Sequence, residues 1–287
     1  MVDYLIFTDV SSDVYSDEAL SHICLIPMDM TVGEDSLTYE QMGDNEYIKH
    51  FYDDIRNGKI VKTSQITPHT YKEIFEPFLE GEFGIIYLSL SSGLSSTFES
   101  AKEAANNLKN KYPDAKIYPV DSLSATGGMG MIVERMLKNK NNGMSIEDNV
   151  ADIEEFKKKI YVNCFVNDLM HLKRGGRIGS ATAAFGTLLN IKPLIYLTEQ
   201  GTLQQFSKAK GEQKAITAMS EAYRTLADFT SQSPVYVCHA DNVETAENLE
   251  KLILSINGNA DIRVGALSPI IGTHLGPGSV VLCFIKK

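Results

Sequence analysis

Short apolar runs alternate with longer segments of helical hydrophobic spacing along most of this chain. Runs with the length and β-branched content of buried strands lie at 4–7, 22–26, 84–88, 116–120, 160–166, 235–239, 262–267 and 280–285. The spacing predicts helices at 45–57, from 67 or 68 through 75, from 95 through 108, up to about 138, and at 145–159, 180–189, 211–229 and 243–256. Alternation of this kind predicts an α/β fold with a parallel sheet covered on both faces.

The order of elements changes near residue 160. Beyond it the pattern reads strand, helix, hairpin (193–206), helix, strand, helix, strand, strand. We therefore predict two domains, residues 1–160 and 161–287. The acidic stretch 29–43 is predicted to be a surface loop or hairpin.

A serine-rich turn follows the strand at 84–88. Ser91, Ser92, Gly93 and Ser95 stand where this strand meets the next helix. Free N–H groups and the positive end of the helix dipole make such a place suited to an anion. Helix capping is the simpler interpretation, and this stretch by itself favours capping.

Two more hydroxyl-containing turns end predicted strands: Thr63-Ser64 and Asp121-Ser122. Because ligands of open α/β sheets collect at the carboxyl ends of the strands, we expect the three turns to lie together. Several neutral donors at one place suit a single carboxylate or phosphate that leaves bulk water. His274 stands in a predicted loop at 272–278, where glycines and a proline place its ring at a turn between strands, although a lone loop histidine is more often a surface residue.

Two glycine-rich stretches carry further signals. The glycines at 127, 128 and 130 lack the dinucleotide-binding spacing, and they allow a helix to pack closely on the sheet or leave room for a ligand tail. The basic loop 172–179 contains Lys173, Arg174 and Arg177. These are either solvated side chains or contacts for a phosphate or an acidic partner.

Composition narrows the class of protein. The formal net charge of −10 over 287 residues disfavours a nucleic-acid groove. The four dispersed cysteines fit small buried hydrophobes in a reducing compartment, and the histidines show no metal-ligand spacing. The N-terminus does not resemble a signal peptide and no apolar run is long enough for a membrane span, so we expect a cytoplasmic protein, for which any contact with lipid would go through a pocket or a transient surface contact.

Seven pieces, in order along the whole chain, resemble the DegV family and its fatty-acid-binding subunits of bacterial fatty acid kinase. They are TDVSSD (8–13), KTSQITP (62–68), SLSSGLSSTFESA (89–101), VDSLSATGGMG (120–130), LKRGGRIG (172–179), LLNIKPLI (188–195) and IIGTHLGPG (270–278). The resemblance implies a three-layer N-terminal parallel sheet, a smaller C-terminal domain with a mixed sheet, and a long-chain fatty acid between the domains.

The same resemblance implies roles for individual residues. Thr63, Ser95 and His274 would bond the carboxylate, with Ser64, Ser92 and Gly93 nearby. A separate ATP-binding kinase subunit would phosphorylate the carboxylate, so this chain would be neither an enzyme nor a holder of a cofactor or metal. Lys173, Arg174 and Arg177 would face the kinase or the transferred phosphate. The apolar wall for the tail is expected from Met129, Met131, Ile132, Phe165, Phe185, Leu188 and Leu189.

Two alternatives remain open. One is a stand-alone acyl hydrolase or transferase with Ser95 as nucleophile and His274 as base, although no carboxylate is recognisably placed to orient the histidine. The other is a module that binds a small phosphometabolite in its glycine loops.

Overall fold

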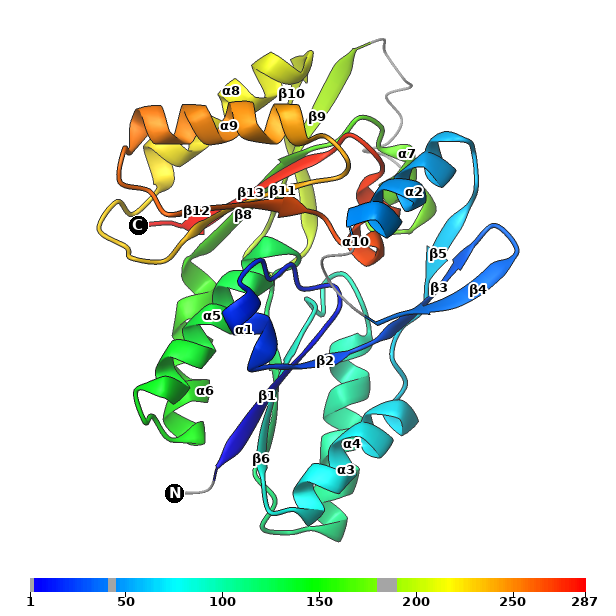
Figure 1. Cartoon of the computed structure of the whole chain (residues 1–287), viewed down its shortest axis with the longest axis vertical. Coiled ribbons are helices and arrows are strands. Elements are labelled where there is room, and N and C mark those ends of the chain that lie inside the picture. Colours follow the sequence, from blue (N-terminus) through cyan, green and yellow to red (C-terminus); the bar gives the residue numbers. More distant parts are fainter. Residues whose placement is uncertain (1–2, 41–44, 180–189) are drawn as a thin grey trace.

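A computed structural model describes residues 3–40, 45–179 and 190–287. The first sheet has the order β2-β1-β6-β7 and is parallel throughout. Its strands are β1 (Tyr4–Asp9), β2 (Cys24–Ile26), β6 (Gly84–Ser89) and β7 (Ile117–Asp121). Helices α3 (Pro68–Glu80) and α4 (Thr97–Lys111) lie on one side of it, and α5 (Gly127–Asn141) and α6 (Ile146–Phe156) on the other (Figure 1). The predicted parallel, doubly covered sheet is confirmed.

The second sheet is mixed and has the order β10-β9-β8-β13-β11-β12. It consists of β8 (Ile160–Phe165), β9 (Ile191–Leu197), β10 (Leu203–Lys210), β11 (Val235–His239), β12 (Ile262–Ala266) and β13 (Val280–Ile285). Helices α8 (Glu212–Leu226) and α9 (Val243–Ile256) cover one face (Figure 1). The predicted hairpin is β9-β10, and the boundary between residues 160 and 161 stays a prediction.

A third, small sheet is antiparallel and projects from the side of the molecule (Figure 1). It contains β3 (Met28–Val32), β4 (Asp35–Tyr39) and β5 (Val61–Thr63), with α2 (Asn45–Arg56) between the last two strands in sequence. The predicted hairpin at 29–43 is therefore present as β3 and β4. Thr63 ends a strand as predicted, but this strand, β5, pairs with β3 in the small sheet and not with the main parallel sheet.

Three short helices depart from the sequence analysis. The polar turn after β1 leads into α1 (Asp17–Ser21), capped by the hydroxyl of Ser16. The predicted basic loop begins within α7 (Met170–Arg174). His274 lies in α10 (Pro269–Leu275) and not in a loop, since Pro269 starts a helix and Gly276 ends it at a φ of +77°. The helix predicted at 180–189 lies outside the described residues.

Helix α5 packs between the two main sheets, against β1 on one side and β8, β11 and β13 on the other. Its first turn allows this because Gly127 has no side chain: a Cβ there would lie 2.6 Å from the Cβ of Tyr236. The glycine stretch therefore serves close helix packing, the first of the two interpretations offered for it.

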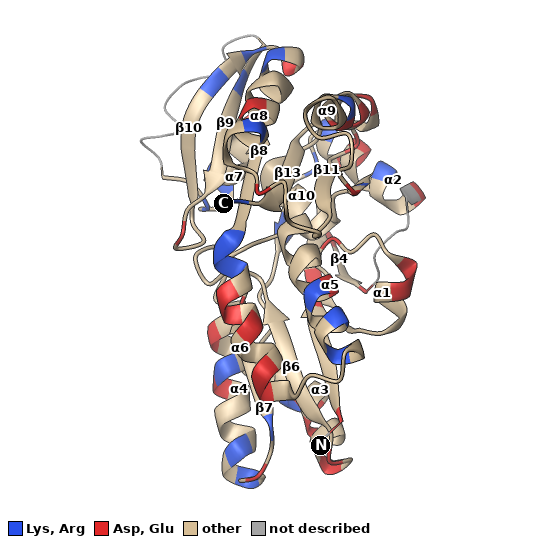
Figure 2. Cartoon of the chain, turned by 90° about the vertical axis from the view of Figure 1, so that its left-hand side faces the viewer, with Lys and Arg blue, Asp and Glu red and all other residues tan. Residues whose placement is uncertain are grey.

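Most charged side chains lie on the outer helices, although Asp9 and Asp13 are buried. In Figure 2 the acidic and basic residues colour the helices α4, α5 and α6, whereas β6 beneath them carries none. All six residues of β6 are buried. The four cysteines are free, and Cys164, Cys238 and Cys283 are buried as expected.

Asn163 is an unusual core residue and yields a stability prediction. It is fully buried in β8, and neither its amide nitrogen nor its oxygen has a hydrogen-bond partner within the described chain. An unpaired buried amide costs roughly 1–3 kcal/mol. We expect Asn163→Leu to raise the free energy of unfolding by about 1–2 kcal/mol, measured by urea denaturation.

Asn149 provides the matched control. It is equally buried, but its amide donates to the Tyr4 hydroxyl and to the Met136 carbonyl, both at 3.0 Å. Asn149→Leu is therefore expected to destabilise the protein. Equal destabilisation by both substitutions would contradict the interpretation of Asn163.

Candidate functional site

A cavity of about 460 Å³ lies between the two main sheets. This is within the range of pockets that enclose a small molecule. Its N-terminal wall comes from residues between Met28 and Thr126, and its C-terminal wall from residues between Val162 and Val281. Six of the lining residues were predicted as ligand-binding: Thr63, Ser64, Ser92, Gly93, Ser95 and His274.

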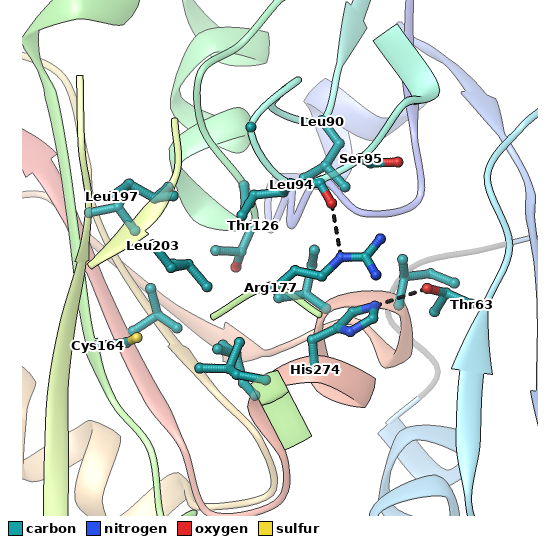
Figure 3. Close-up of a pocket in the computed structure, with 18 of the residues that line it drawn as sticks. Thr63, Leu90, Leu94, Ser95, Thr126, Cys164, Arg177, Leu197, Leu203 and His274 are labelled. Atoms are coloured by element: carbon teal, nitrogen blue, oxygen red, sulfur yellow. Dashed lines mark hydrogen bonds between the residues drawn. The ribbon is translucent and has the colours of Figure 1, made fainter. Parts of the chain in front are cut away.

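At one end of the cavity, Thr63 and His274 form a hydrogen bond. The Thr63 hydroxyl lies 2.9 Å from Nε2 of His274 (Figure 3). Strand β5 supplies the threonine and α10 the imidazole, so a pair 211 positions apart in sequence is brought together by the packing of the small sheet on α10. In Figure 3 the pair and Arg177 lie at one end of the cavity, the head end, and Leu197, Leu203 and Cys164 lie at the other.

The imidazole of His274 is neutral near pH 7. Burial lowers its pKa to about 4, and the positive charge of Arg177 and the neighbouring His171 act in the same direction. Its Nδ1 is buried without a hydrogen-bond partner in the described part of the chain. Gly175 lies directly against that nitrogen, and a side chain there would collide with it.

The serine turn forms another part of the head end. The Ser95 hydroxyl accepts the Thr97 N–H at 3.2 Å, at the start of α4, and lies 2.8 Å from the Thr97 hydroxyl. Ser95, which precedes the N-cap residue Ser96, thus satisfies the first N–H of α4 and also lines the cavity. The N–H of Ser92 donates to the Asp121 carboxylate at 3.1 Å, so the serine turn and the Asp121-Ser122 turn meet at this edge of the sheet.

The turn between β9 and β10 closes over the serine turn. The Ser91 hydroxyl donates to the Gly201 carbonyl at 2.8 Å. A Cβ on Gly93 would lie 2.6 Å from that same carbonyl oxygen, so only glycine permits this approach. The contact joins the two halves of the cavity wall.

Arg177 lies inside the cavity, a position that the sequence did not indicate. Its Nε donates to the Leu94 carbonyl at 2.9 Å and its Nη1 to the Gly175 carbonyl (Figure 3). Both partners are neutral, and no carboxylate of the described residues pairs with the guanidinium. It is therefore a fixed positive charge beside the Thr63–His274 pair.

A second cavity of about 220 Å³ adjoins the first and shares Thr63, Arg177 and His274 with it. Its other lining residues include four basic side chains: Lys59, Lys62, His171 and Arg174. Lys173 is exposed and lines neither cavity. The three basic residues grouped in the sequence analysis thus have different positions.

The apolar wall differs from the predicted one. Met129, Met131, Ile132 and Phe165 are buried in the core and do not line the cavity, so their prediction is wrong. Phe185, Leu188 and Leu189 lie outside the described residues. The wall is formed instead by Leu90, Leu94, Ala125, Val162, Cys164, Ile195, Leu197, Leu203, Ile270, Ile271 and Val281. The period-2 pattern of β8 and β13 could have indicated Val162, Cys164 and Val281, but not which face met a cavity.

The described residues give less support to a serine hydrolase site or a metal site. Ser95 bonds Thr97 and not His274, and within the described residues no carboxylate hydrogen-bonds to that imidazole. A serine hydrolase needs both contacts. Over the described ranges, no group of three or more His, Cys, Asp or Glu side chains is placed to hold a metal ion, and no helix is both long enough and apolar enough to span a bilayer.

Comparison with known proteins follows this geometry. Residues 4–287 match the model of the DegV family, whose description is that of uncharacterised proteins. A DegV domain-containing protein of Clostridium perfringens is 34% identical and covers 99% of this chain and 98% of its own length.

Solved structures show the same fold. A DegV family protein of Thermus thermophilus, described as binding fatty acid, is 27% identical with a TM-score of 0.85 over 99% of this chain and all of its own. The fatty acid kinase B3 protein of Streptococcus pneumoniae, loaded with linoleic acid, has a TM-score of 0.87 at 22% identity, with both chains covered completely.

Proposed function

Since this chain belongs to the DegV family, we propose that it binds a long-chain fatty acid in the cytoplasm and presents the carboxylate to a partner ATP-dependent kinase. The observation that carries the proposal is the cavity itself, which combines an apolar wall with one polar end. A relative of known structure that shares 27% of its sequence is described as fatty-acid binding.

The wall provides the affinity for the tail. Burying each methylene contributes about 0.8 kcal/mol, so a chain of roughly 16 carbons gains on the order of 10 kcal/mol before ordering costs. A sugar phosphate would gain nothing from the leucine and isoleucine side chains that line the cavity. The wall therefore favours an acyl chain over the phosphometabolite alternative.

The head end is suited to a carboxylate. When Nε2 of the neutral His274 ring carries the proton, the Thr63 hydroxyl oxygen accepts a hydrogen bond from Nε2–H. The threonine can then turn its own O–H toward the ligand. Ser64, Ser92 and Ser95 also line the cavity and can offer hydroxyls to the carboxylate, whereas the N–H of Gly93 already donates to the Ser91 hydroxyl at 3.1 Å. Arg177 adds the positive charge that offsets the cost of taking a carboxylate out of water.

The second cavity provides room for phosphoryl transfer. It lies next to the Thr63–His274 pair and is lined by Lys59, Lys62 and Arg174. We infer that the phosphoryl group is accommodated on this side, with Lys173 and Arg174 facing the kinase or its nucleotide. Exchange of the acid with a membrane would need only a transient surface contact.

Native mass spectrometry tests the proposal. Protein purified from a bacterial host is expected to carry an adduct with the mass of a C16–C18 acid, and the delipidated protein should bind palmitate that glycerol 3-phosphate cannot displace. Absence of an acyl adduct together with no palmitate binding would overturn the proposal. Displacement of palmitate by glycerol 3-phosphate would favour the phosphometabolite module.

A further inference from the structure

Asp13 is a fully buried carboxyl that the proposed function does not use. Its side chain is 2% exposed, in the loop between β1 and α1. Oδ1 accepts the Ser268 N–H at 2.9 Å, and Oδ2 accepts the Thr126 hydroxyl. Both bonds are long-range contacts: Thr126 lies 113 positions and Ser268 lies 255 positions from Asp13 in the sequence.

Both partners belong to structures that form the site. Thr126 lines the main cavity and is the N-cap residue of α5, with an unfavourable φ of +52°. Its backbone is fixed by the same loop, because the Asp13 N–H donates to the Thr126 carbonyl at 3.2 Å. Ser268 is the N-cap of α10 but makes no capping bond with its own hydroxyl.

Helix α10 transmits position from Ser268 to His274. The helix has only seven residues, so its two ends are about 10 Å apart and move as one unit. Two tyrosine hydroxyls hold the chain just before it: Tyr52 donates to the Leu267 carbonyl and Tyr15 to the Ala266 carbonyl, each at 3.0 Å. Asp13 is the contact made with the N-cap residue itself.

We propose that Asp13 is a positioning residue for ligand binding, because its carboxyl holds the start of α10 against Thr126 and thereby places His274 beside Thr63. This inference rests on the proposed function for its consequence in lipid binding. Its structural part, the placement of the His274 ring, is independent of any ligand.

Asp13→Ala is the test variant because it removes both acceptor oxygens, and Asp13→Asn is its conservative counterpart, since the amide oxygen can still accept the Ser268 N–H and the amide NH2 can donate to the Thr126 hydroxyl. Burial raises the pKa of Asp13 to about 7, and the groups that face it from neighbouring elements are Tyr15, Tyr52 and Cys283. Since the native pKa exceeds the ordinary value, ionisation removes stability as the pH rises from about 4 to 7. The asparagine variant cannot ionise and should be at least as stable as the wild type at pH 8.

The experiment measures the pKa of His274 in ligand-free protein by NMR titration of its ring resonances, which are assigned with the His274→Ala variant. We expect Asp13→Ala to move the pKa of His274 from about 4 toward its ordinary value, because a displaced ring loses burial, and Asp13→Asn to leave it near the wild-type value. Asp17→Ala is the control, since Asp17 lines the same small cavity as Asp13 but hydrogen-bonds neither Ser268 nor Thr126. An unchanged His274 titration in Asp13→Ala would overturn the proposal, whether or not the wild type binds palmitate.

Palmitate affinity provides the second measurement. We expect a loss of about 10-fold in Asp13→Ala, the size of one hydrogen bond to a charged group, and no change in Asp13→Asn or Asp17→Ala. In a His274→Ala background the Asp13 substitution should cost nothing more, because Asp13 acts through that ring. Additive losses would show that Asp13 acts elsewhere and contradict the proposal. A wild type that binds no palmitate but shows the expected titration shift would contradict only the proposed function.

Discussion

Replacing His274 by alanine is expected to weaken palmitate binding by about 10- to 100-fold, because a hydrogen bond to a charged group contributes roughly 1.5–3 kcal/mol. The imidazole orients the Thr63 hydroxyl from 2.9 Å. Without it, a buried carboxylate would face an unconstrained threonine and an emptied space. Isothermal titration calorimetry on delipidated protein at pH 7.5 measures the effect.

The comparison variants identify the cause. Thr63→Val removes the other half of the pair and should produce a loss of similar size, and the double variant should lose less than the sum of the two. His239→Ala serves as the control, because His239 is also partly buried with a lowered pKa but does not line the cavity. Wild-type affinity in His274→Ala would rule out the proposed head end.

The second large effect is expected from separating Arg177 from Arg174. Arg177 lines the main cavity without an ion-pair partner in the described chain, and Arg174 lines only the second cavity. We expect Arg177→Gln to reduce palmitate affinity by about 10-fold or more, because the carboxylate loses its compensating charge. Arg174→Gln should bind palmitate within about 2-fold of the wild type.

Turnover should show the opposite dependence. With ATP and the proposed kinase subunit, we expect Arg174→Gln to lower the kcat/KM of the kinase for the palmitate-loaded protein by about 10-fold or more. The sequence interpretation assigned both arginines to the kinase or the phosphate, and the position of Arg177 in the cavity changes that expectation. Equal loss of palmitate affinity in both variants would show that the whole basic segment belongs to the pocket. Unchanged affinity in Arg177→Gln would remove the guanidinium from carboxylate binding.

Local patterns in the sequence were sufficient for most of the elements. Strand β6 is a continuous apolar run, and α3 begins with the Thr67 cap and Pro68 that predict a helix start. These signals act within a few residues of one another, so they can be recognised without knowing the fold. The failures occur where a distant contact decides. The strand that ends at Thr63 could be recognised, but not that its partner is β3 in a separate sheet.

The residue types of the site were likewise recognisable, but their arrangement was not. Hydroxyls before helix starts and a histidine among glycines indicated neutral donors for an anion, and the resemblance to a known family selected which of them mattered. Arg177 could not be placed, because its position depends on the Leu94 carbonyl, which comes from the other half of the cavity wall.

The sequence by itself thus determined the alternation of strands and helices and the hydroxyl-rich turns, because each depends on neighbours along the chain. The tertiary structure alone decided that β5 meets α10, that Arg177 points into the cavity and that Asp13 holds the end of the helix carrying His274. Those contacts join residues far apart in sequence, and their geometry is set by how α5, the small sheet and the two main sheets pack together.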